Sequence, residues 1–193
     1  HYMKDNEYIN EILNGDIHTT NQESAGLESR NQAKTFIYAL IYSAGDARLG
    51  KIVQGNRADG KRLRESFVNN LPAFKHLKDR VDRASSRGYL KGLDGRKIFI
   101  RHRHASLNTL LQGAGAIVMK KALTILSDML VLQTIPAKIV ANIHDEWQIE
   151  VPEAQANGVG ALAVRCIEQA SPEYDLRCPL TGEFNIGDSW YET

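Results

Sequence analysis

Apolar residues follow helical spacing over most of the chain. Together with the glycine and proline breaks between them, they predict a short helix over residues 7–13, a long helix over 24–44, shorter helices over 47–53, 58–70 and 74–85, and a second long helix over 106–132. Ser24 and Ser29 are the candidate N-caps of the first long helix, and Gly45 is its stop signal. The clearest spacing lies in the second long helix, at Leu107, Leu110, Leu111, Ala114, Ile117, Val118 and Ile125.

Two stretches alternate in the manner of β-strands. Residues 88–92 and 97–100 flank Asp94-Gly95, which is a short-range hairpin signal. Further on, the runs 138–143 and 147–151 flank a polar turn, and residues 153–170 predict a final helix. Because helices come first and strands with packing helices follow, the order predicts an α+β fold with a helical subdomain.

Length and composition exclude several classes of protein. The 193 residues suffice for one domain or two small ones, and 42% hydrophobic with 24% charged residues is too apolar for a disordered chain. No run approaches roughly 18 apolar residues, so we expect no spanning helix and no membrane partner. Cys166 and Cys178 cannot form a disulfide framework, and reduced thiols together with a polar N-terminus indicate a cytoplasmic location.

The net charge of +1 conceals a strong asymmetry along the chain. Residues 1–47 carry a net charge of −4, residues 48–104 carry +11, and residues 105–193 carry −6. A basic middle between acidic ends suggests that one region holds a polyanion and another holds a cation. A solvated basic helix face is the other interpretation of the same charge pattern.

Four side chains spaced four residues apart form one stripe on the first long helix. They are Arg30, Lys34, Tyr38 and Tyr42, and each step of four drifts only about 40° around a helix. Two cations followed by two aromatic rings could hold a triphosphate at one end and a base or sugar at the other. Spacing alone favours the other interpretation, which is a partly buried amphipathic helix.

The turn His144-Asp145-Glu146 places adjacent carboxylates between two predicted strands. Carboxylates at a hairpin tip can converge on a hard divalent cation, although one pair needs further oxygen ligands to hold Mg²⁺. A solvated acidic turn is the alternative.

A second polar stripe precedes and enters the second long helix, at His104, Asn108 and Gln112. Asn and Gln amides can donate to the acceptors that every base pair shows in the minor groove, and a polar seam between helices is the competing interpretation. A basic run that suits phosphate neutralisation leads into this stripe: Lys75, Lys78, Arg80, Arg83, Arg87, Lys91, Arg96, Lys97, Arg101 and Arg103.

In this order the motifs resemble family A DNA polymerases, the bacterial polymerase I class and its phage relatives. The string 30–42 (Arg-Asn-Gln-Ala-Lys-Thr-Phe-Ile-Tyr-Ala-Leu-Ile-Tyr) is similar to that family's fingers helix, and residues 144–146 to its palm motif. Residues 14–19, 93–96 and 108–115 match segments around them. The resemblance covers the whole chain and is closest to the phage branch. It implies a palm-to-fingers connection over 1–20, fingers over 21–88, and part of an antiparallel-sheet palm over 89–193.

The resemblance implies that the first stripe binds the incoming dNTP. Arg30, Lys34 and His18 would contact the triphosphate, and Lys34 would donate a proton to the pyrophosphate leaving group. Tyr38 would lie by the sugar, and Tyr42 would stack near the templating position.

The resemblance also implies the DNA and metal ligands. Primer–template DNA would be contacted by His104, Asn108, Gln112 and His144. Asp145 would hold the catalytic metals, with Glu146 as a secondary carboxylate. The reaction would be attack of the primer 3′-hydroxyl on the α-phosphate of a dNTP between two Mg²⁺ ions.

Two departures from the family pattern bear on activity. The fingers motif normally ends Tyr-Gly, whereas this chain reads Tyr42-Ser43, a change that we expect to be tolerated. The first palm aspartate has no counterpart, because Asp5 and Asp16 occupy helical or turn contexts. We therefore expect a fragment that is inactive alone and completed by an upstream portion with the N-terminal palm and thumb, in the same or a separate chain, in a bacterial or phage-infected cell.

Three other interpretations compete with this one. A single-subunit RNA polymerase shares such a helix, but its palm motif resembles His-Asp-Ser, so Glu146 favours DNA synthesis. A non-catalytic DNA-binding module would use the basic run and the second stripe without turnover. A naturally split polymerase would assemble from two halves.

Overall fold

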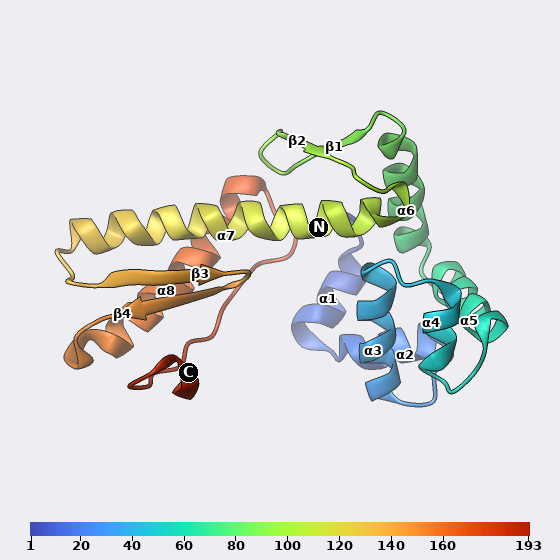
Figure 1. Cartoon of the computed structure of the whole chain (residues 1–193), viewed down its shortest axis with the longest axis horizontal. Helices are drawn as coiled ribbons and strands as arrows, with labels where there is room; N and C mark the ends of the chain where they lie inside the picture. Colours follow the sequence, from blue (N-terminus) through green and yellow to red (C-terminus); the bar gives the residue numbers. More distant parts are fainter. The chain divides into compact units, whose positions relative to one another are not determined.

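The protein is described by a computed structural model that covers His1–Thr193. Eight α-helices and four short strands follow one another along the chain (Figure 1). The helices are α1 (Asn6–Asn14), α2 (Ile17–Ala25), α3 (Arg30–Ile41), α4 (Asp46–Lys51), α5 (Arg57–Asn70), α6 (Pro72–Ser85), α7 (Ser106–Leu132) and α8 (Ala156–Ala170). The strands are β1 (Tyr89–Lys91), β2 (Lys97–Phe99), β3 (Lys138–Ile143) and β4 (Glu146–Glu150). The α+β fold class is confirmed.

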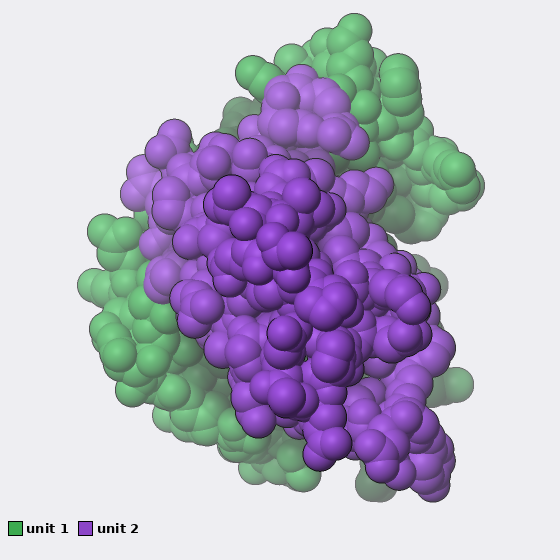
Figure 2. All heavy atoms as spheres, turned by 90° about the vertical axis from the view of Figure 1, so that its left-hand side faces the viewer, with its two compact units in different colours: residues 1–91, 97–111 green, residues 92–96, 112–193 purple.

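The chain forms two compact units (Figure 2). Unit 1 comprises residues 1–91 and 97–111, and unit 2 comprises residues 92–96 and 112–193. The helix α7 begins in unit 1 and continues in unit 2 from residue 112 onward. None of the helices is both long enough and apolar enough to cross a membrane.

Unit 1 has a core built around three phenylalanines. The rings of Phe36 and Phe67 meet edge to face at 5.6 Å between centroids, and those of Phe67 and Phe74 at 5.3 Å. Since Phe36 comes from α3, Phe67 from α5 and Phe74 from α6, this contact joins three helices around one centre. A second cluster in the same unit packs Leu77 of α6 and Leu90 of β1 together.

Two glycines let α4 and α5 approach each other closely. A Cβ on Gly60 of α5 would overlap the carbonyl oxygen of Asp46 and the backbone nitrogen of Gly50 in α4. A Cβ on Gly50 would overlap the carbonyl oxygen of Asn56. The backbones can meet here only because both positions lack a side chain.

The long helix expected over residues 24–44 is wrong, because the chain breaks at Gly26. Gly26 adopts a left-handed conformation (φ 71°) and ends α2, with its N–H and that of Leu27 donating to carbonyls in the last turn. The helix α3 then starts at Arg30, with Ser29 as the N-cap that accepts a hydrogen bond from the backbone N–H of Gln32. Leu27 is itself buried in the core, so the apolar spacing continues through the break and conceals it.

Unit 2 packs the hairpin of β3 and β4 against α7 and α8. The strands pair antiparallel, and their register shifts between Ile139 and Ala141, which leaves Val140 as a bulge. Ile139 and Ile149 pack with Leu126 of α7 and Leu162 of α8 in one apolar cluster. Ile139 and Ile149 therefore lie on the face of the hairpin that the two helices cover.

Candidate functional site

The predicted stripe on α3 faces solvent along its whole length. Arg30, Lys34, Tyr38 and Tyr42 are exposed, the two rings by 53% and 58%. The opposite face of the helix is buried at Ala33, Phe36, Ile37 and Leu40. Burial of the opposite face fixes the rotation of the helix, so its cations and rings face outward together.

Arg30 is oriented by an ion pair with Asp16. The Arg30 Nε lies 2.6 Å from Asp16 Oδ2, and both side chains are largely exposed. The guanidinium holds the pKa of the Asp16 carboxyl well below its usual range, with hydrogen bonds from Thr19 and from the backbone N–H of His18 acting in the same direction. Because the pair uses Nε, the two terminal nitrogens of the Arg30 fork remain for an anion.

His18 lies in the first turn of α2, close to Asp16, which is the N-cap of that helix. Its backbone N–H donates to Asp16 Oδ1 at 3.0 Å, and its side chain is half-buried. The ring Nδ1 is buried and has no hydrogen-bond partner. The expected triphosphate ligands His18 and Arg30 are thus both tied to one residue, Asp16.

The chain after α3 is braced by a residue that sequence reasoning did not single out. Arg64 of α5 donates from Nε to Asp46 Oδ1 and from Nη2 to the carbonyl oxygen of Ala44, each at 2.7 Å. Between Tyr42 and this brace, Ser43 adopts a left-handed conformation with φ 61°. The position where the resembled motif has glycine is therefore one whose backbone favours glycine.

The turn between β3 and β4 displays the two predicted carboxylates. Ile143 pairs with Glu146, so His144 and Asp145 form the tip, and His144 has φ 54°. Asp145 and Glu146 are both exposed. Glu146 Oε1 accepts from the Gln148 amide and from Trp190 Nε1, the latter at 3.0 Å.

The two carboxylates form only part of a metal-binding set. Nowhere in the chain do three or more His, Cys, Asp or Glu side chains gather in a group that could hold a metal ion. The exposed oxygens of Asp145 and the remaining oxygen of Glu146 suit a hard cation in chemistry, and water, a bound molecule or another chain would supply the further oxygen ligands.

The second predicted stripe lies at the start of α7. His104 and Gln112 are exposed, Asn108 is half-buried, and the imidazole rings of His102 and His104 stack 5.6 Å apart. The Oδ1 of Asn108 is buried without a hydrogen-bond partner. All but Lys78 of the ten residues in the basic run are exposed.

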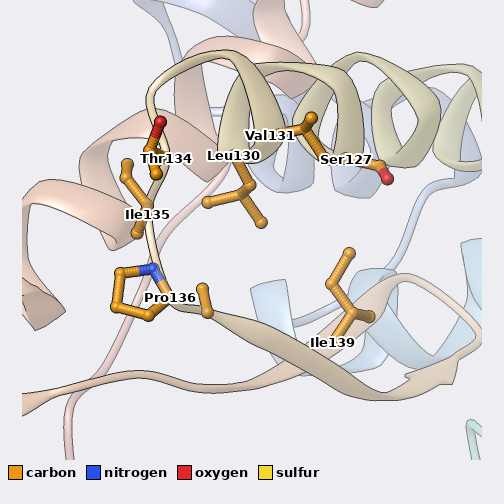
Figure 3. Close-up of a pocket in the computed structure, with 8 residues that line it drawn as sticks. Ser127, Leu130, Val131, Thr134, Ile135, Pro136 and Ile139 are labelled. Atoms are coloured by element: carbon orange, nitrogen blue, oxygen red, sulfur yellow. The ribbon is translucent and has the colours of Figure 1, made fainter.

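Neither of the two surface hollows described next is lined by a predicted site residue. An open hollow of about 560 Å³ in unit 2 lies between the end of α7 and the start of β3, lined by Leu130, Val131, Ile135 and other mostly apolar residues (Figure 3). Another, of about 590 Å³ in unit 1, is acidic and includes Asp16 in its wall. The apolar hollow has no titratable side chain in its wall, so it carries no acid–base chemistry.

Comparisons with known proteins agree on one family. The model of DNA polymerase family A matches residues 1–192. The chain is 39% identical to the DNA-directed DNA polymerase of Escherichia phage Phieco32 and 37% identical to that of Escherichia phage T7, over 96% and 95% of its own length. It spans only 31% and 29% of those two proteins.

A solved structure shows the same fold. The POL domain of Pol1 from M. smegmatis, in complex with DNA primer-template and dNTP, superposes on 93% of the chain with a TM-score of 0.79 at 22% identity. The chain covers 35% of that structure.

Proposed function

Because the chain belongs to DNA polymerase family A, we propose that it is the dNTP-binding and metal-binding part of an enzyme that performs DNA-templated DNA synthesis in a bacterial or phage-infected cytoplasm. Since it spans about a third of its phage relatives, the remaining palm and the thumb belong to another portion of the polymerase. The proposed subdomains are a connection over 1–20, fingers over 21–88 and the C-terminal palm over 89–193.

The observation that carries the proposal is the exposed stripe on α3. Arg30 offers two terminal guanidinium nitrogens, and Lys34 follows one turn later as an exposed cation. In the proposed role both bind the triphosphate, and Lys34 Nζ gives a proton to the leaving pyrophosphate oxygen. His18 adds a further contact to the phosphates.

The aromatic half of the stripe suits the rest of the nucleotide. Tyr38 is more than half exposed and presents a ring and a hydroxyl in the position proposed for the sugar. Tyr42, at the end of α3, would stack by the templating base.

The β3–β4 turn is the proposed metal site. Asp145 and Glu146 supply carboxylate oxygens of the type that Mg²⁺ prefers, and the triphosphate and the rest of the polymerase would supply the other ligands. When bound, two Mg²⁺ ions would activate the primer 3′-hydroxyl and neutralise charge on the phosphates. Since these two acids stand without a third, we expect no turnover until the other portion is added.

Primer–template binding is assigned to the start of α7 and to the turn. His104, Asn108 and Gln112 would follow the minor groove, and His144 would lie near the primer end. The exposed basic run would neutralise backbone phosphates.

Binding of a fluorescent dNTP to the 193-residue chain tests the proposal. We expect Lys34→Ala and Arg30→Ala each to raise the Kd about tenfold, because each removes a charge-assisted contact to phosphate. Lys61→Ala is the matched control, since Lys61 is an exposed cation of unit 1 that pairs only with Glu65, at 3.7 Å. Duplex binding with dNTP affinity unchanged in both variants would favour a non-catalytic DNA-binding module.

A further inference from the structure

Glu146 is held from a distant part of the chain. Its Oε1 accepts a hydrogen bond at 3.0 Å from the indole N–H of Trp190, which lies 44 residues further along the sequence. The same oxygen accepts from the side-chain amide of Gln148, two residues further along β4. Two donors on Oε1 leave Oε2 as the oxygen that can bind a cation.

Residues 181–193 bring Trp190 to this place by a sequence of contacts within unit 2. Thr181 Oγ1 donates to Glu168 Oε1 at 3.2 Å near the end of α8. The ring of Phe184 then covers Gly160 so closely that a Cβ at Gly160 would overlap it. The segment therefore runs back along α8 toward the hairpin (Figure 1, red).

A small closed turn ends this segment and carries Trp190. The backbone N–H of Asp188 donates to Glu192 Oε2 at 2.8 Å, and Thr193 Oγ1 donates to the carbonyl oxygen of Trp190 at 3.2 Å. A Cβ on Gly187 would come within 2.6 Å of Glu192 Cβ, so the turn is tight. Trp190 thus reaches Glu146 from a folded support at a fixed place.

We propose that Trp190 is a positioning residue, which fixes the Glu146 carboxylate so that Oε2 joins Asp145 in binding a divalent cation. This inference rests on the metal role given to the two acids under the proposed function. A hydrogen bond to a carboxylate ligand restricts its rotamers, so less entropy is lost when the metal binds. Loss of such a partner typically weakens metal binding about 10–100-fold.

Two measurements on the 193-residue chain test the proposal. Indole ¹H–¹⁵N spectra resolve Trp190 from Trp147, and Glu146→Ala should shift the Trp190 resonance and speed its hydrogen exchange because the acceptor is gone. Electron paramagnetic resonance of free Mn²⁺ should show Kd about tenfold higher for Trp190→Phe, which keeps a ring and loses the N–H. In the Glu146→Gln background, Trp190→Phe should have no additional effect.

Tyr191→Phe is the control, because Tyr191 is the next aromatic residue and is 97% exposed. Its Mn²⁺ affinity should equal that of the wild type. A Trp190 resonance indifferent to Glu146→Ala, or Mn²⁺ binding unchanged in Trp190→Phe, overturns the inference alone. A wild-type chain that binds no Mn²⁺ overturns the metal role itself, and with it the proposed function of the turn.

Discussion

At the scale of single residues, Asp16 organises the end of the α3 stripe that carries the cations. It caps α2, accepts from Thr19 Oγ1 at 3.0 Å, and holds the Nε of Arg30. All of these contacts need the ionised carboxylate or are strengthened by it. The stripe is therefore coupled to the protonation of one exposed acid.

This coupling predicts a pH dependence of stability. The pKa of Asp16 is lowered in the folded chain, so the stabilisation is fully present above the unfolded value, about 4, and is lost as pH falls toward the folded pKa. Asp16→Asn removes the titration. The difference in urea midpoint between wild type and Asp16→Asn should therefore shrink below about pH 4. An equal difference at pH 7 and at about pH 3 would contradict the assignment.

Ser43 carries a backbone cost at the end of the same stripe. Its φ of 61° disfavours any L side chain. We expect Ser43→Gly to raise the free energy of unfolding by about 1 kcal/mol, the usual penalty of a left-handed non-glycine residue. Urea denaturation measures the change, and a destabilised Ser43→Gly protein would show that the side chain contributes a favourable contact.

At the scale of elements, the crossing of α4 and α5 depends on the absence of side chains. Gly60→Ala would press a Cβ into the backbone of α4, so we expect destabilisation by about 3 kcal/mol, at the upper end for overpacking. Gly115→Ala is the matched control, because a Cβ at that exposed helical position meets no atom within 4 Å. It should be neutral or stabilising by up to about 1 kcal/mol. Equal effects of the two substitutions would refute the close approach.

Sequence periodicity predicts the elements well where one face is buried and the ends carry local signals. The bounds of α7, Ser106–Leu132, agree with the expected ones, and the Asp94-Gly95 turn joins β1 to β2 as expected. The apolar pattern does not reveal the break at Gly26, because Leu27 is buried in the core although it lies outside both helices. The alternation of apolar and polar residues does not predict the bulge at Val140, because it does not determine which residues of the two strands pair.

At the scale of the whole molecule, the sequence predicts the exposed stripe on α3 and the β3–β4 turn. It does not predict the residues that hold them in place. Arg30, Lys34 and Asp145 are found from spacing and from the motifs that resemble the family. Arg64 and Trp190 act through contacts 18–44 residues apart in the sequence, which no periodicity encodes.

The most direct test is templated primer extension by a chimera in which this chain replaces the matching segment of the phage T7 polymerase, to which it is 37% identical. We predict Mg²⁺-dependent incorporation of the complementary nucleotide, and a loss of about 10²–10³-fold with Asp145→Asn, because that variant removes a carboxylate from the metal site. Duplex binding measured in the same samples shows that the chimera is folded. A chimera that binds duplex but does not extend the primer, or extends it equally with Asp145→Asn, would contradict the account.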